Sequence, residues 1–312
     1  MPARTRPSHP GHRPTDWALL VTLVALWGSA FPLTKIAVAG IPPGWLVVGR
    51  LALAALLLLP MAAWRGGLGG GGRRDWGFLV LIAFLGNVLP FWLIAWGQRG
   101  IDSGLSGILM AIMPLAVIAL AHIFVPGERL TRRRLAGFAL GFVGVAVLFG
   151  PAALHGPTPA PNPDTPGTLA AMLAVLGGAL CYAVSTILSR LRPTRDALSS
   201  AALVTLIAAL MALPLAAIWE PLPSLAPTWT ELAALTTLGV FSTATAAVAY
   251  FRLIASAGPS FTSQLNYLIP LWALGLGILF LGESPSANHV YALGLILTGV
   301  LIAATRRRSL AA

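Results

Sequence analysis

The residue in this 312-residue sequence best suited to bind an ion is an arginine inside an apolar run. Arg50 lies about eight residues, or roughly 12 Å at 1.5 Å per helical residue, from the start of the run 43–63. In a membrane helix, a lipid-facing arginine costs roughly 2.5 to 3.5 kcal/mol, and no nearby in-run Asp or Glu is available to pair with it. We therefore expect Arg50 to line a wet pathway and attract an anion or carboxylate. The alternative is a structural tie between helices.

Six further residues could contact a small molecule, because they are polar or aromatic side chains inside apolar runs. They are Trp27, Asn87, Tyr182, Gln264, Asn266 and Tyr267. Singly, such side chains are also typical of packing, of membrane-interface anchoring or of hydrogen bonds between helices.

Two prolines fall at matching places in the fourth and ninth apolar runs. We expect Pro114 and Pro270 to interrupt these helices and to gate a binding site between them. Gln264, Asn266 and Tyr267 precede Pro270 within about one helical turn, which favours them over isolated polar residues. The alternative is that proline is simply common in membrane helices.

The sequence lacks the residue patterns of an enzyme. No HExxH sequence, paired aspartates or serine with a general base occurs at membrane depth, so we predict no catalytic residue. The single cysteine, Cys181, excludes a disulfide, and we expect no metal and no cofactor. Glu128 and Glu283 follow glycines at the edges of apolar runs, and we interpret both as structural. No Asp or Glu lies at mid-run, which disfavours the carboxylate proton relay of many multidrug-cation exporters.

Composition places these residues in a protein whose solvent is mostly lipid. Hydrophobic residues make up 57% of the sequence, charged residues 9%, and the mean hydropathy is +0.84. These values exclude an ordinary soluble surface, and the long apolar runs differ from the short alternating strands of outer-membrane barrels. We therefore expect an all-α integral membrane protein. The net charge of +11 comes from residues in the breaks between runs, so nucleic acid is not an expected partner.

Ten apolar runs are near the length of about 20 residues that a membrane helix needs. They cover residues 17–34, 43–63, 76–97, 104–125, 135–150, 168–189, 198–219, 231–251, 261–281 and 289–305. Of the 20 Lys and Arg residues, Lys35 and Arg99 lie in one set of breaks, Arg50 lies inside a run, and the other seventeen lie in the alternate set. The positive-inside rule makes this alternate set cytoplasmic, and it includes both termini.

The last five runs repeat the first five. A shift of 155 residues, the spacing from Trp27 to Tyr182, also places Arg190 on Lys35 and Glu283 on Glu128. Because five is odd, the two copies insert with opposite orientations and form an inverted repeat. The predicted units are a cytoplasmic tail (1–16), a five-helix repeat (17–150), a Pro-rich periplasmic linker (151–167), a second five-helix repeat (168–305) and a cytoplasmic tail (306–312).

Three stretches carry a resemblance to a known family. They are Trp27-Gly28-Ser29-Ala30-Phe31 with Lys35, the segment from Pro43 to Arg50, and Leu281-Gly282-Glu283 before a glycine-rich last run. The sequence resembles the EamA family of the drug/metabolite transporter superfamily over about residues 17–305. The resemblance implies a ten-helix carrier whose relatives export amino acids and other metabolites or carry nucleotide sugars and organic phosphates. The second copy departs from the pattern, because Cys181 to Ser185 lacks the Gly-Ser-Ala-Phe sequence.

The predicted function is a secondary carrier that moves an amino-acid-like or organic-acid metabolite by alternating access. Its expected partners are that small molecule and the lipid bilayer of a bacterial cell inner (plasma) membrane. The direction, efflux, comes from the resemblance alone. Glycines in the fifth run (Gly137, Gly141, Gly144) and the tenth (Gly294, Gly299) indicate close packing, either between the halves or between the protomers of a homodimer. The competing functions are a non-transporting membrane scaffold or regulatory protein and a multidrug exporter.

Overall fold

The fold is described from a computed structural model, which covers residues 13–67, 72–126, 131–154, 165–191, 196–222 and 226–304. Every regular element within these ranges is helical, which confirms the all-α prediction. The first half contains α1 (Pro14–Gly28), α2 (Ala30–Ala37), α3 (Pro43–Trp64), α4 (Arg73–Ala83), η1 (Phe84–Val88), α5 (Leu89–Gly97), α6 (Ser103–Met110), α7 (Met113–Phe124) and α8 (Arg132–Leu154). The second half contains α9 (Thr168–Leu191), α10 (Ala197–Trp219), α11 (Trp229–Thr237), η2 (Leu238–Thr245), α12 (Ala246–Thr262), α13 (Leu265–Leu281) and α14 (Ala287–Ala304).

Eight helices, each counted across its internal breaks, are long and apolar enough to cross a membrane. They are Pro14–Ala37, Pro43–Trp64, Arg73–Gly97, Ser103–Phe124, Arg132–Gly150, Thr168–Leu191, Ala197–Trp219 and Trp229–Gly258. Two apolar helices, Leu265–Leu281 and Ala287–Ala303, are shorter. All ten overlap the predicted runs, and the count of ten membrane spans stays a prediction. Helix α8 continues to Leu154, four residues into the predicted linker, and residues 155–164 lie outside the described ranges.

Several of the helices are broken along their length. The break between α6 and α7 falls at Ala111 and Ile112, just before Pro114, which lies in the first turn of α7. Such a break is expected there, because a proline clashes with the carbonyl four residues earlier. The break before α13 falls at Ser263 and Gln264, and α13 continues through Pro270 itself.

Two π-helical segments occupy equivalent places in the two halves. The 155-residue shift that relates the sequence repeats places the last residue of η1, Val88, on Thr243 in η2. In η2 the hydroxyls of Thr243 and Thr245 donate to carbonyl oxygens five residues earlier, at 2.8 and 2.9 Å. The two segments lie in the middle of the third membrane helix of each half. Segments of this kind are rare and are often found at functional sites.

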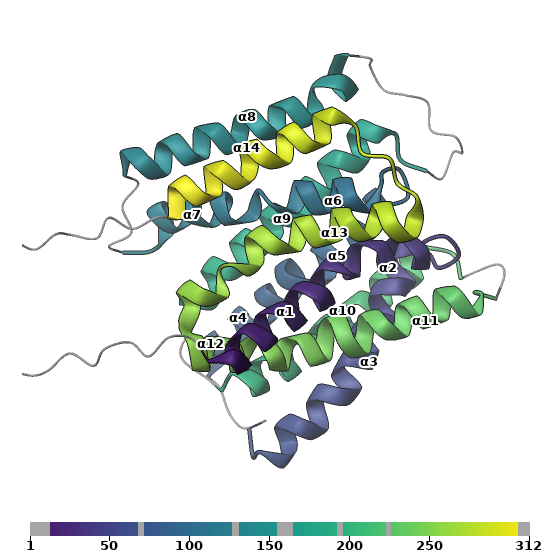
Figure 1. The fold of residues 1–312 in the computed structure, drawn as a ribbon. Coiled ribbons are helices and arrows are strands. Elements are labelled where there is room, and N and C mark those ends of the chain that lie inside the picture. Colours follow the sequence, from purple (N-terminus) through teal and green to yellow (C-terminus); the bar gives the residue numbers. More distant parts are fainter. Residues whose placement is uncertain are drawn as a thin grey trace, which may run out of the picture.

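Helices of the first half pack against helices of the second half. The last helices of the halves, α8 and α14, lie side by side, as do the second helices, α3 and α10 (Figure 1). A Cβ atom on Gly137 of α8 would meet the carbonyl oxygen of Gly299, and one on Gly299 would meet that of Gly137. These glycines therefore allow close packing between the halves of one chain. The homodimer stays a prediction.

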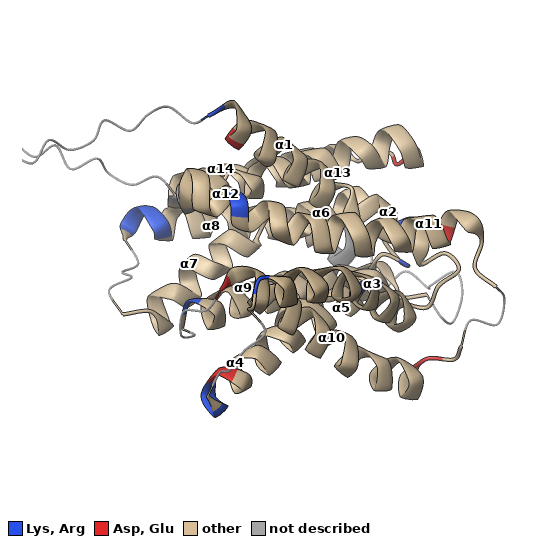
Figure 2. Cartoon of the chain, turned by 90° about the horizontal axis from the view of Figure 1, so that it is seen from below, with Lys and Arg blue, Asp and Glu red and all other residues tan. Residues whose placement is uncertain are grey.

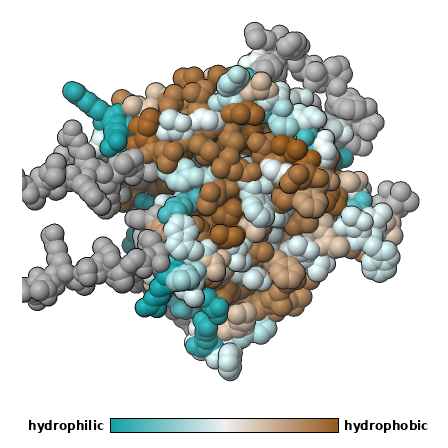
Figure 3. Space-filling model, viewed as in Figure 1, coloured by the Kyte–Doolittle hydropathy of each residue, from teal (hydrophilic) through white to brown (hydrophobic). Residues whose placement is uncertain are grey.

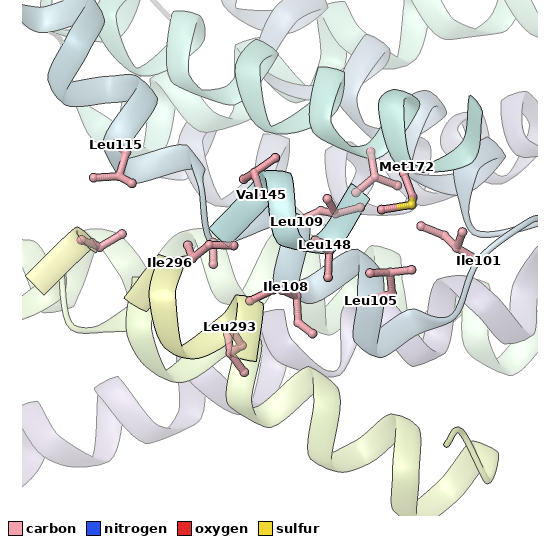
Figure 4. Packing of buried hydrophobic residues seen from close by; sticks show 14 of the residues in the cluster. Ile101, Leu105, Ile108, Leu109, Leu115, Val145, Leu148, Met172, Leu293 and Ile296 are labelled. Carbon is pink, nitrogen blue, oxygen red and sulfur yellow. The ribbon is translucent and has the colours of Figure 1, made fainter. Parts of the chain in front are cut away.

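The largest apolar cluster lies where α6, α8, α9 and α14 meet. Its side chains interdigitate around Ile108, Leu109 and Ile296, all of which are fully buried (Figure 4). Large apolar side chains also cover the outer surface, as the brown areas of Figure 3 show. Leu279 and Phe280 of α13, for example, are 78% and 77% exposed. An apolar exterior around an apolar core is the arrangement expected of a protein embedded in lipid.

The two ends of the bundle differ in charge. At one end, named the basic end here, α4 begins at Arg73 and α8 at Arg132, and most of the blue segments in Figure 2 gather there. Helix α1 begins and α14 ends at this same end (Figure 1). At the opposite end, named the carboxylate end, Glu220 follows α10 and Glu283 follows α13.

Candidate functional site

Arg50 lies within α3 and contacts both halves of the molecule. Its Nε donates a hydrogen bond of 2.8 Å to Oγ1 of Thr243 in η2. Its guanidinium carbon lies 3.8 Å from the centre of the Phe91 ring in α5, close enough for a cation–π interaction. Helices α3 and α5 belong to the first half and η2 to the second, so this one side chain joins the two halves near the π segments.

Most of the hydrogen-bonding capacity of Arg50 is unused. A guanidinium has five N–H donors, and within the described residues only the Nε–H donates, to Thr243. The Thr243 hydroxyl donates in turn to the carbonyl of Leu238, which fixes its oxygen as the acceptor for Arg50. No carboxylate among the described residues forms a hydrogen bond or ion pair with Arg50. The remaining donors are arranged as a planar fork, the geometry that binds a carboxylate or phosphate with two parallel hydrogen bonds.

An aromatic pair lies beside Arg50. The Phe91 ring, which the guanidinium contacts, lies 6.3 Å from the ring of Tyr182 in α9, in an edge-on arrangement. Trp27, at the end of α1, packs instead against Tyr250 of α12, with ring centres 5.2 Å apart. Phe91 thus lies between Arg50 and Tyr182, and Trp27 belongs to a separate aromatic pair.

The polar candidates lie in two segments. Asn87 is in η1, Gln264 is at the break before α13, and Asn266 is in the first turn of α13. Their side chains form no hydrogen bond with any other described residue. Tyr267 packs at the edge of the largest apolar cluster, as Tyr182 does. Among the described residues, no hydrogen bond joins Asn87, Gln264 or Asn266 to Arg50.

Of the two glutamates interpreted as structural, Glu283 lies within the described part of the chain and Glu128 lies outside it. Glu283 accepts hydrogen bonds from the backbone N–H groups of Ser103 (2.7 Å) and Gly104 (2.8 Å), the first two residues of α6. A third carboxylate, Glu220, accepts from the N–H of Gly44 (2.7 Å) and from Nε1 of Trp92 (2.8 Å).

Sequence reasoning missed the two residues that contact Arg50. Thr243 lies in the stretch Ser242-Thr243-Ala244-Thr245, whose hydroxyls are unusual in an apolar run and are a signal that could have been used. Phe91 carried no such signal, because one phenylalanine in an apolar run resembles any other. Lys35 and Glu220, which bind backbone groups at the carboxylate end, were also not predicted as contacts.

The Arg50 site combines one cation with the Thr243 hydroxyl and the Phe91 ring. Among the described residues, no carboxylate forms a hydrogen bond or ion pair with this cation. No group of three or more His, Cys, Asp or Glu residues suited to a metal ion occurs within that part of the chain.

Comparison with protein families identifies the two repeats. The model of the EamA-like transporter family matches residues 16–150 and 169–305, close to the two predicted repeats. A probable terminal-alkyne amino-acid exporter of Streptantibioticus cattleyicolor is 28% identical over 288 residues, which is 92% of each chain. An S-adenosylmethionine/S-adenosylhomocysteine transporter of Chlamydia muridarum is 26% identical, over 88% of this chain and 86% of the relative.

Two further proteins are similar to this chain over most of its length. An uncharacterized inner membrane transporter of Escherichia coli K12, YedA, is 26% identical, over 91% of this chain and 88% of the relative. A solved crystal structure superposes with a TM-score of 0.63 over 93% of this chain and 96% of that chain. Its sequence is 20% identical, so this similarity concerns the fold alone.

Proposed function

This chain belongs to the EamA-like transporter family, and from that premise we propose that it is a secondary carrier exporting a small carboxylate-bearing metabolite by alternating access. Membership makes it a transporter of the membrane-spanning, two-repeat type rather than an enzyme, and the helices described above fit that architecture. The proposal adds the substrate class, the direction and the mechanism.

The proposed topology has ten membrane spans, with the basic end and both termini in the cytoplasm. The arginines that open α4 and α8 support this orientation, because basic residues are retained on the cytoplasmic side. The carboxylate end then faces outwards. The proposed membrane is a bacterial inner membrane, which is where the name of the E. coli relative YedA places that protein.

The proposed substrate class rests on the guanidinium of Arg50, most of whose N–H donors have no partner among the described residues. A charge in the membrane interior is costly unless it is paired, and Arg50 has one neutral hydrogen bond and one aromatic face as its described partners. A carboxylate would fill the free fork of N–H donors, and Phe91 and Tyr182 provide apolar surface for the rest of the molecule. The relatives named for amino acids and S-adenosylmethionine support the same class, because both molecules carry an α-carboxylate.

The test is counterflow in proteoliposomes with a panel of labelled amino acids and organic acids, followed by competition with matched neutral derivatives. We expect an accepted amino acid to compete and its carboxamide to fail, because the amide lacks the charge that Arg50 binds. Arg50→Ala should lower transport at least a hundredfold, and Arg50→Lys should retain part of it because it keeps the charge without the fork.

Protein folding must be measured beside transport, because Arg50 also joins α3 to η2. Thermal unfolding in detergent should show Arg50→Ala folded at the assay temperature. Equal competition by the acid and its amide, or full transport by Arg50→Ala, would rule out the anion-binding role. A panel without any counterflow, given folded protein, would contradict the proposed substrate class.

A further inference from the structure

Two charged side chains hold the five-residue connection between α5 and α6 at the carboxylate end. Nζ of Lys35, in α2, donates to the carbonyl oxygens of Gln98 (2.7 Å) and Ile101 (2.8 Å) within this connection. Glu283, after α13, accepts the N–H groups of Ser103 and Gly104, where α6 begins. The first N–H groups of a helix have no partner inside the helix and carry partial positive charge, so a carboxylate there is favourable.

The local backbone aims Glu283 at α6. Gly282 has a φ of 65°, in the left-handed region that favours glycine, and it ends α13. The chain then folds back, so that the N–H of Glu283 donates to the carbonyl of Gly277 at 3.0 Å. Because α13 belongs to the second half and α6 to the first, the carboxylate fastens one half of the molecule to the other.

The closed contact leaves polar groups buried without partners. Gln98 and Ser103 are both 0% exposed, and among the described residues the two amide atoms of Gln98 and Oγ of Ser103 have no hydrogen-bond partner. Buried unpartnered polar atoms are unfavourable, and access to water would satisfy them. The charged contacts therefore favour closure of this end, whereas Gln98 and Ser103 favour its opening.

The residue equivalent to Lys35 at the basic end of the bundle makes different contacts. The 155-residue repeat places Arg190, at the basic end of α9, on Lys35. Arg190 is exposed, and its side chain forms no hydrogen bond to any described residue, whereas Lys35 forms two. In an inverted repeat, two conformations can exchange the arrangements of the two ends.

We propose that Lys35 and Glu283 form a latch that closes the carboxylate end, and that its release opens this end to water. The proposal rests on the proposed carrier function, since alternating access requires one end to close while the other opens. In the open conformation Glu283 leaves the start of α6, and Gln98 and Ser103 become hydrated. The latch residues act on the conformational equilibrium and need not touch the substrate.

The test is cysteine accessibility in nanodiscs, where both ends of the protein face water. Cys181 is the single cysteine, so a Cys181→Ala background gives a clean reporter. Ser106→Cys in this background reports opening, because Ser106 lies one turn into α6 and is 0% exposed. We expect a soluble maleimide to label it at least tenfold faster when Glu283→Gln or Lys35→Met is added.

Two controls separate release of the latch from general loosening. Glu231→Gln should leave the rate unchanged, because the Glu231 carboxylate accepts from the backbone N–H of Thr228, the N-cap residue of its own helix. A second reporter, Ser199→Cys at the basic end, should label no faster, since Ser199 is also 0% exposed and lies far from Glu283 in the bundle. Equal labelling of Ser106→Cys with and without Glu283→Gln would overturn the latch, and so would faster labelling at both reporters.

This experiment fails separately from the proposed function. Labelling needs no substrate, so faster labelling in a protein without transport would support the latch and contradict the carrier. Transport together with an unchanged labelling rate would support the carrier and overturn the latch.

Discussion

The middle of the bundle and its carboxylate end hold partly buried charges in opposite ways. At the carboxylate end, Lys35, Glu220 and Glu283 each make two short hydrogen bonds to groups on other elements. In the middle, Arg50 makes a single hydrogen bond and rests on an aromatic ring. A charge that makes two hydrogen bonds to other elements holds those elements together, whereas we expect the four free N–H donors of Arg50 to receive a ligand.

The comparison predicts the largest loss of fold stability for Glu220→Ala. The variant loses charge-assisted bonds to the Gly44 N–H and Trp92 Nε1–H, each worth about 1.5 to 3 kcal/mol, so a loss of about 3 kcal/mol is expected. Thermal unfolding in detergent measures it. Glu231→Ala is the control at the same end and should cost about 1 kcal/mol, since it removes part of a capping box within one helix. Equal losses would show that bridging adds nothing.

In the middle, Phe91→Leu should weaken substrate binding and leave the fold nearly unchanged. A desolvated cation–π contact is worth about 2 kcal/mol and an exposed one about 0.5 to 1, so we expect KM to rise about fivefold to tenfold. Counterflow in proteoliposomes measures KM. The matched control is Phe78→Leu: its ring lies 5.9 Å from the guanidinium carbon of Arg74 at the basic end, and its loss should leave KM unchanged. A larger fall in stability than in affinity would assign Phe91 to packing.

The helices and the interior position of Arg50 could be predicted from sequence because both depend on local properties. A run of apolar residues determines a membrane helix by itself, and a single arginine inside it is conspicuous. The family was likewise predictable, because Trp27 to Phe31 and Leu281 to Glu283 are short continuous stretches, and the family match confirms it.

The partners of these residues could not be predicted, because they lie far away in the chain. Arg50 and Thr243 are 193 residues apart, and Ser103 and Glu283 are 180 residues apart. Only the packing of the two halves brings them together. The 155-residue repeat indicates which helices correspond, but it does not indicate which side chains are in contact. The π segments were missed for another reason: their sequences, such as Phe84 to Val88, have no feature that distinguishes them from an α-helix.

Thr243→Val tests whether the hydrogen bond in the middle orients Arg50 for a ligand or simply ties α3 to η2. A hydrogen bond to a charged donor is worth about 1.5 kcal/mol or more, so its loss should raise KM about tenfold if it orients Arg50. The control is Thr245→Val. The hydroxyl of Thr245 donates to the carbonyl of Val240 in the same π segment and forms no hydrogen bond with Arg50. A lower melting temperature with unchanged KM would identify Thr243 as a tie and remove the contrast with the carboxylate end.

The smallest effect is expected for a carboxylate whose hydrogen bonds all lie within its own helix. Asp196 caps α10 at the basic end and accepts from the backbone N–H and the hydroxyl of Ser199, at 2.8 and 2.7 Å. These bonds favour the ionised form and lower the pKa of Asp196. The lowered pKa means that the stabilisation is present above the ordinary aspartate pKa and is lost as the pH falls through the folded-state value. Asp196→Ala should therefore lower stability by about 0.5 to 1 kcal/mol at neutral pH and by less in acid. Melting temperatures across pH test this, with Asp196→Asn as the uncharged cap. A loss as large as that of Glu220→Ala would mean that bridging two helices is not what makes a carboxylate stabilising.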